Sequence, residues 1–287
     1  MKTASIFFII VLALVTDASA QSAAAKAAPA AAKAGDRYIF GVSEGTSGSI
    51  DIAVAIDKYR PLAAVMEKAL GKSVVISFVR NFEMLEAGMK SGEFDLVLAR
   101  PSDYPARGVR DYKYGMVASL KPDGHCVLIV EKSSPLKTVA DVKGKSIILP
   151  EKISYMSKFC AAELRDKGII VARENVTYAK EQGGVGWTVE NKLADVGGVA
   201  SYSGVAKNWE KGGQRILHKS VPQPYSPLIA SARVPADRIE KLKAALTGLD
   251  KTDEGKKVLE TLGIQGFNPE TPERLLALLA WLEKSAL

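Results

Sequence analysis

Two arginines stand where this sequence could hold an anion. Arg80 and Arg100 each follow a predicted β-strand. A planar guanidinium binds a tetrahedral anion or a carboxylate through two parallel hydrogen bonds. Either arginine could instead form a solvated ion pair, or an ion pair between two parts of the fold. Both are therefore candidate ligand-binding residues.

Three motifs of common catalytic centres are missing from the sequence. It has no HExxH helix, P-loop or CxxC pair. Its two histidines, His125 and His218, and its two cysteines are too widely separated to predict a metal site from spacing. The sequence favours binding without chemistry, and we predict no catalytic residue, metal or cofactor.

Cys126 and Cys160 are the only cysteines. In an oxidising compartment a disulfide is the first interpretation, and two buried free thiols are the second. An unpaired cysteine could serve as a thiol ligand or a nucleophile. The sequence leaves this choice open.

The first residues have the pattern of a secretory signal peptide. Lys2 gives a basic start, residues 6–15 form an apolar run, and Ala18-Ser19-Ala20 is a small-residue cleavage site. The run is about half of the roughly twenty apolar residues that a membrane span needs. We predict a signal peptide at residues 1–20, cleaved after Ala20, and a soluble protein in the periplasm.

The next segment has the composition of a tether. Residues 21–36 consist mostly of Ala, Lys and Pro, with no large apolar side chain that could offset the entropy of ordering. The formal net charge of the chain is +7, which suits an anionic partner. Solubility alone is the alternative, because the positive charges are scattered. Secretion argues against nucleic acid as a partner.

From residue 37 the sequence alternates short β-rich runs with amphipathic stretches, which is typical of α/β proteins. A helix that ends at Gly71 should be kinked or restarted by Pro61. Further on we expect a glycine-rich loop at 182–186 before a helix at 188–192. Helices are also expected at 236–249, 253–262 and 272–282.

The chain repeats one order of features. A strand, a loop, a helix, an Asp-led strand and a loop tyrosine occur in each half, with Asp95 before Tyr104 and Asp195 before Tyr202. We therefore expect two lobes joined by a hinge near His125. Lobe 1 comprises residues 37–123 and 225–287, and lobe 2 comprises residues 124–224.

Several segments resemble a known family. The run 133–136 followed by 140–145 is similar to the segment that leads into the second lobe of type 2 periplasmic binding proteins. The segments 59–62, 92–96, 101–104 and 253–259 resemble the branch that binds phosphonate, phosphite and phosphate for ABC importers. The resemblance covers residue 37 to the end. It implies a two-lobed α/β fold with the ligand cleft at the lobe interface.

The resemblance also implies ligand contacts. Ser154, Tyr155 and Ser157 stand where the family has a serine- and threonine-rich helix start that holds phosphonate oxygens, and helix N-termini favour anions. Ser154 could instead only cap the helix, or do both. Tyr104 matches the ligand-side tyrosine of the first lobe, unless its ring packs against the lobe surface.

Loops at the ends of other strands should face the same cleft. Ser43, Glu44 and Thr46 follow the first strand, and Gln182 and Tyr202 lie in the corresponding loops of the second lobe. Glu44 would repel an anion unless it accepts a proton from the ligand or binds an amine. The phosphonate binders tend to have a histidine near Gln182, which this chain lacks, so phosphonate itself is in question.

The leading hypothesis is a monomer that captures a small oxyanion and delivers it to the permease of an ABC importer. One alternative is an accessory protein that presents an oxyanion or arsenite to a sensor histidine kinase, for which a free thiol would matter. The other is a secreted enzyme, because the same architecture also hosts biosynthetic transferases.

Overall fold

The computed structural model describes residues 36–45 and 51–284. The predicted signal peptide, almost all of the predicted tether and Thr46 lie outside these residues. Among the described residues, no helix has the length and apolar character needed to cross a membrane.

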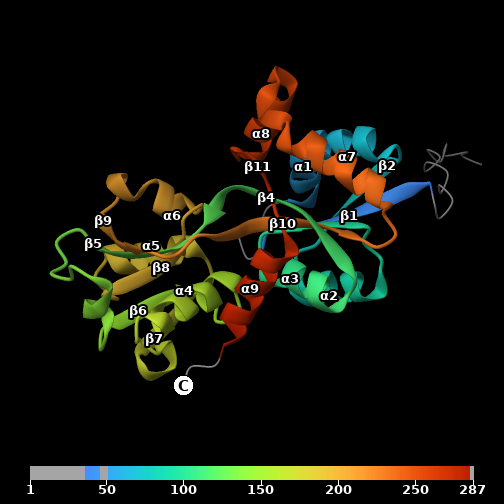
Figure 1. Ribbon diagram of the computed structural model, residues 1–287. Helices are drawn as coiled ribbons and strands as arrows, with labels where there is room; N and C mark the ends of the chain where they lie inside the picture. Colours follow the sequence, from blue (N-terminus) through green and yellow to red (C-terminus); the bar gives the residue numbers. More distant parts are fainter. Residues whose placement is uncertain (1–35, 46–50, 285–287) are drawn as a thin grey trace, which may run out of the picture. The chain divides into compact units, whose positions relative to one another are not determined.

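The first sheet has six strands in the order β11-β4-β10-β3-β1-β2 (Figure 1). β1 (Arg37–Ser43) pairs in parallel with β2 (Ser73–Phe78) and β3 (Leu96–Ala99). β10 (Gln223–Ser231) runs antiparallel to β3 and to β4 (Tyr114–Gly124), and β11 (Gly266–Pro269) runs antiparallel to β4. The carboxyl ends of β1 and β3 therefore lie side by side.

Helices cover both faces of this sheet (Figure 1). They are α1 (Ile52–Leu70), α2 (Phe82–Ser91), α3 (Asp103–Asp111), α7 (Ala236–Thr247), α8 (Asp253–Leu262) and α9 (Pro272–Glu283). On one face, Leu62 and Met66 of α1 are buried with Phe40 of β1. On the other, Leu85 of α2 and Leu275 of α9 are buried. Removing these apolar side chains from water is the main favourable contribution to folding.

The second sheet has five strands in the order β7-β6-β8-β5-β9. Its strands are β5 (Cys126–Glu131), β6 (Ser146–Pro150), β7 (Asn175–Ala179), β8 (Val196–Ala200) and β9 (Gln214–Lys219). Its helices are α4 (Tyr155–Asp166), α5 (Gln182–Glu190) and α6 (Gly204–Lys207). Short 3-10 turns occur at Val139–Val142, Val171–Arg173, Trp209–Lys211 and Leu249–Lys251.

The predicted α/β fold class is confirmed, and its strands form two sheets. The first sheet draws its strands from residues 37–124 and 223–269, and the second from residues 126–219. Residues 34–287 group into one unit by their contacts, so the lobe boundaries at 123/124 and 224/225 stay a prediction. Gly71 ends α1 in the left-handed conformation, at φ 70°, which glycine adopts at little cost.

Two local predictions need correction. α1 is a single helix that continues through Pro61, so it is not restarted there, and Tyr59 and Leu62 remain buried on either side of the proline. The expected loop at 182–186 is the first half of α5. There Val185 and Val189, four residues apart, pack on Gly197 of β8, where an added Cβ would lie 2.8 Å from each. Close helix-to-sheet packing outweighs the low helix propensity of glycine here.

Candidate functional site

Two segments connect the sheets and are bonded to each other. One links β4 to β5 through His125, and the other links β9 to β10 through Ser220. The ring Nδ1 of His125 lies 2.7 Å from the Ser220 carbonyl oxygen, and the backbone N–H of Cys126 donates to Ser220 Oγ at 2.9 Å. Burial holds the pKa of His125 below its ordinary value, even though the Ser220 carbonyl raises it. The ring is therefore neutral at pH 7 and donates from Nδ1.

A small cavity lies between the strand ends of the two sheets. Its volume is about 30 Å³, which is room for about one or two water molecules. Five predicted site residues line it, and these are Arg100, Ser154, Tyr155, Gln182 and Tyr202. We call it the inner cavity. It brings together side chains from both sheets that are far apart in the sequence, such as Arg100 and Tyr202.

The N-terminus of α4 faces the inner cavity. Ser154 is the N-cap, and its Oγ accepts from the backbone N–H of Ser157 at 3.3 Å. The Ser154 side chain is buried and also lines the inner cavity, so the capping role and a ligand-facing position coexist. Ser157 Oγ donates to the Pro150 carbonyl at 2.5 Å and does not line the inner cavity.

Two other polar groups complete the second-sheet side of the inner cavity. Gln182 Oε1 accepts from the backbone N–H of Ala200 at 2.6 Å. Its amide nitrogen has no hydrogen bond within the part of the chain that the structure describes, so it remains a donor for a ligand. Burial raises the pKa of the Tyr155 phenol well above its ordinary value, which keeps it protonated, and its hydroxyl already pairs with the Ser102 side chain.

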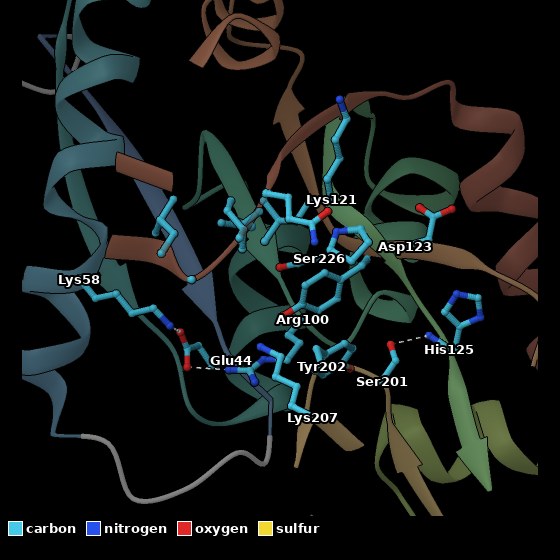
Figure 2. A pocket seen from close by; sticks show the side chains of 18 of the residues that line it. Glu44, Lys58, Arg100, Lys121, Asp123, His125, Ser201, Tyr202, Lys207 and Ser226 are labelled. Atoms are coloured by element: carbon cyan, nitrogen blue, oxygen red, sulfur yellow. Dashed lines mark hydrogen bonds and ion pairs between the residues drawn. The ribbon is translucent and has the colours of Figure 1, made fainter. Parts of the chain in front are cut away.

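Glu44 is the acidic residue at this site, and it is fully paired. Its buried carboxylate accepts from Lys58 Nζ and Arg100 at 2.6 Å each, and from the Tyr59 hydroxyl at 2.7 Å. Figure 2 shows Lys58 and Arg100 approaching it from two sides. Burial alone would raise the pKa of Glu44, but Arg100, Lys58 and Tyr59 outweigh burial and lower it. The charge of Glu44 is thus balanced before any ligand arrives.

A second and much larger cavity adjoins the same residues (Figure 2). Its volume is about 460 Å³, and Glu44, Arg100 and Tyr202 line both cavities. We call it the outer cavity. The Arg100 guanidinium lies 5.8 Å from the centre of the Tyr202 ring, which stacks on Tyr225 at 4.2 Å. A pocket of this size is in the range of roughly 300–1,000 Å³ that accommodates drug-sized ligands.

Five basic side chains and two carboxylates line the outer cavity. The basic ones are Lys58, Arg100, Lys121, Lys207 and Lys219, and the carboxylates are Glu44 and Asp123. Asp123 is paired with the guanidinium of Arg274. The cavity between the sheets is therefore electropositive, and its chemistry suits an anion.

Comparison with known proteins agrees with this geometry. Residues 50–275 match the family model described as ABC transporter, phosphonate, periplasmic substrate-binding protein. This chain belongs to that family. The resemblance expected from the sequence is confirmed, and the family is one of substrate-binding proteins. The sequence has no significant match among curated proteins.

Solved structures with the same fold are distant in sequence from this family member. XAC2383 from Xanthomonas citri bound to ATP is 15% identical with a TM-score of 0.69, covering 86% of this chain and 97% of that one. PhnD1 from Prochlorococcus marinus in complex with methylphosphonate is 14% identical with a TM-score of 0.65, covering 85% and 97%. A binding protein component of an ABC phosphonate transporter from Pseudomonas aeruginosa is 16% identical with a TM-score of 0.62, covering 85% of each chain.

Besides Ser157, three predicted site residues of this phosphonate-binding family member lie apart from both cavities. Arg80 is exposed and lines neither of them. The Tyr104 ring stacks on Phe82 at 5.2 Å, with the Arg107 guanidinium 4.3 Å from its centre. Ser43 is buried at the end of β1, where its Oγ accepts from Gly45. In the present arrangement the side chains of Tyr104 and Ser43 make their contacts within the first sheet and its helices.

The two cysteines are joined by a disulfide, with their Cα atoms 5.3 Å apart. This is the first of the two interpretations that the sequence left open, and no free cysteine remains. The bond links the first residue of β5 to the middle of α4. It therefore fixes the helix that carries Ser154 relative to the connecting segment at His125, and it leaves no thiolate for an arsenite site.

Sequence reasoning missed the lysines and Tyr225 of the outer cavity. Lys121 and Lys219 lie within a few residues of the two connecting segments, and Lys207 ends the short helix after Tyr202. For Lys121 and Lys219, the positions next to the two expected lobe boundaries were the available signal. Residues that flank a hinge face both lobes, and so they are natural candidates for a cleft.

Proposed function

We propose that this protein captures a small oxyanion, such as a phosphonate, phosphite or phosphate, between its two sheets and delivers it to the permease of an ABC importer. The observation that carries the proposal is the convergence of Ser154, Gln182 and Arg100 on the inner cavity. Hydroxyl, amide and guanidinium donors match the acceptor oxygens of such an anion. The helix N-terminus at Ser154 adds a partial positive charge.

The pairing of Glu44 supports an anionic ligand. An unpaired carboxylate at this position would repel an oxyanion, but Lys58 and Arg100 already balance its charge. The guanidinium of Arg100 has several donors and uses one nitrogen on Glu44. Its remaining donors are available to a ligand in the inner cavity.

Binding in this proposal requires movement of the two sheets relative to each other. The inner cavity of about 30 Å³ is too small for a phosphonate, since that volume is room for about one or two waters. The lobes open to admit the anion and close on it, as in other hinged binding proteins. No chemistry on the ligand is part of the proposal.

The test is calorimetric titration of the protein with methylphosphonate, phosphite and phosphate. We expect at least one of them to bind. Ser154→Ala should weaken that binding about tenfold or more, because the variant loses one charge-assisted hydrogen bond to the ligand. Thr252→Ala removes a cap of the same kind at α8, away from the inner cavity, and should leave the affinity unchanged. Absence of binding by all three anions, or consumption of a ligand in a turnover assay, would overturn the proposal.

A further inference from the structure

Three lysines of the outer cavity have no hydrogen-bond or ion-pair partner among the residues that the structure describes. The side chains of Lys121, Lys207 and Lys219 make no hydrogen bond or ion pair with any residue in the described ranges. They come from three different elements, β4, α6 and β9. Lys58 and Arg100, by contrast, share the carboxylate of Glu44.

The carboxylates of the outer cavity cannot neutralise these lysines. Glu44 already accepts from two basic side chains and a phenol. Asp123 is held by Arg274 through both of its guanidinium NH2 groups. The free charge of the outer cavity is therefore that of the three unpaired ammonium groups.

The lysines are spread over the cavity. Figure 2 places Lys121 at its upper edge and Lys207 at its lower edge, on opposite sides of Arg100 and Ser226. Lys121 lies in β4 of the first sheet, and Lys207 lies in α6, one of the helices of the second sheet. One compact oxyanion cannot contact both edges of a cavity of about 460 Å³, whereas a ligand with separated anionic groups can.

The wall between these charges is aromatic. Tyr202 and Tyr225 present stacked rings, and burial raises the pKa of both phenols. Both therefore stay protonated and offer an apolar body with a donor at its tip. Such a wall favours a ligand with a carbon skeleton over a bare inorganic polyanion.

We infer that the ligand is an organic polyanion, in which one oxyanion group occupies the inner cavity and a carbon body carries at least one further ionised group to Lys121, Lys207 and Lys219. The inference rests on the proposed function, because the first group uses the inner cavity. The residues shared by the two cavities, Glu44, Arg100 and Tyr202, mark where the ligand passes from one to the other. Organic phosphates and phosphonates with a second phosphate or carboxylate belong to this class.

The test compares probes that differ in body and charge. Methylphosphonate has the oxyanion group alone, inorganic triphosphate has charge without a carbon body, and 2-carboxyethylphosphonate and ATP have both. We expect 2-carboxyethylphosphonate or ATP to bind at least tenfold more tightly than methylphosphonate and than triphosphate. If neither exceeds methylphosphonate, or if triphosphate equals the tighter of the two, the inference is wrong.

Lysine variants locate the second anionic group. Lys121→Gln, Lys207→Gln and Lys219→Gln remove one unpaired charge each, and we expect at least two of them to weaken the tighter organic probe about tenfold. The same variants should change the affinity for methylphosphonate less than about threefold. Lys257→Gln, at an exposed position of α8, is the matched control and should change neither. Thermal unfolding checks that each variant folds.

The outcomes separate this inference from the proposed function. If methylphosphonate binds in a Ser154-dependent way while the lysine variants leave every organic probe unaffected, the inference fails and the proposed function stands. If no probe binds at all, the proposed function fails. If an organic probe binds with lysine dependence but without Ser154 dependence, the inner cavity is not where its first group lies, and both fail.

Discussion

At the residue scale, Glu44 shows how an acidic residue can belong to an anion site. Its carboxylate holds Lys58 and Arg100 in place, so its effect on a ligand is to position cations rather than to repel. Burying Glu44, Lys58 and Arg100 together removes three charged groups from water, which costs free energy. Such a network is stable only when every member is hydrogen bonded. Here the Tyr59 hydroxyl supplies the remaining donor.

This pairing predicts a pH-dependent stability that Glu44→Gln should remove. The pKa of Glu44 is lowered in the folded protein, so its contribution is fully present above about pH 5 and is lost as the pH falls through the folded pKa. At pH 7 we expect the variant to lose about 1–3 kcal/mol of unfolding free energy. The difference from wild type should shrink as the pH is lowered from 6 to 3 in urea titrations.

The control for Glu44 is a carboxylate on the surface. Glu240→Gln removes an exposed partner of Lys243, and exposed pairs contribute between 0 and about 1 kcal/mol. We expect it to change neither the stability nor its pH dependence. A Glu44→Gln difference that stays constant from pH 6 to 3 would contradict the role assigned to the ionised carboxylate.

At the scale of elements, much of the site was predictable because it follows strand ends. Arg100 comes after β3, Ser154 after β6, and Tyr202 after β8. In α/β proteins the carboxyl ends of strands share one edge, where ligands bind. The strands before Arg100 and Tyr202 could be recognised in the sequence, whereas the place of Ser154 at the cleft was implied by the family resemblance.

Other parts of the site depend on packing between distant elements. Tyr104 follows β3 just as Arg100 does, yet its ring packs against Phe82 of α2 and Arg107 of α3 and not at the cavities. Lys207 lines the outer cavity from α6, which does not adjoin either connecting segment in the sequence. Strand and helix patterns do not contain this information, since it arises when the two sheets meet.

The disulfide attaches one helix, α4, to the second sheet. It joins α4 to β5 across 34 residues, and closing a loop of that length stabilises by about 3–4 kcal/mol in the chain-entropy model. We expect the double variant Cys126→Ala/Cys160→Ala to lose about that much unfolding free energy in urea titrations. Its affinity for methylphosphonate should change less than about twofold, because neither cysteine lines a cavity.

Wild-type protein that is unfolded and refolded under reducing conditions is the matched comparison for this variant, because it loses the bond but keeps both sulfur atoms. Its stability should fall by a similar amount. A double variant as stable as the oxidised wild type would show that the packing of α4 on the sheet suffices without the bond.

At the scale of the whole molecule, α9 connects the two sheets. Its Leu275 and Leu278 are buried in the apolar cluster that also contains Leu128 of β5 and Leu149 of β6. Near its end, the Trp281 indole N–H donates to Asp166 of α4 at 2.6 Å. Closure of the lobes on a ligand must therefore preserve or remake contacts of α9 as well as those of the cleft.

An ion pair between the sheets' helices gives the sharpest test of closure. Lys158 of α4 contacts Asp103 of α3 at 2.9 Å, and Lys158 lines neither the inner nor the outer cavity. Lys158→Gln should disfavour the closed arrangement by up to about 1 kcal/mol. Because ligand affinity scales with the population of the binding-competent state, we expect methylphosphonate to bind about three- to fivefold more weakly in calorimetric titrations.

The design of this experiment separates closure from general effects of charge. Asp103 keeps Arg107 as a partner in the variant, so the buried carboxylate is not left unpaired. Lys167→Gln removes a similar charge from the residue after α4, where the contact with Glu163 stays within the second sheet's own helix, and it should leave the affinity unchanged. Small-angle scattering should show ligand-free Lys158→Gln to be more extended than ligand-free wild type, with the difference removed by saturating methylphosphonate. Equal affinities for the two variants would mean that the ion pair does not bias closure, and that the apolar contacts of α9 hold the sheets together without it.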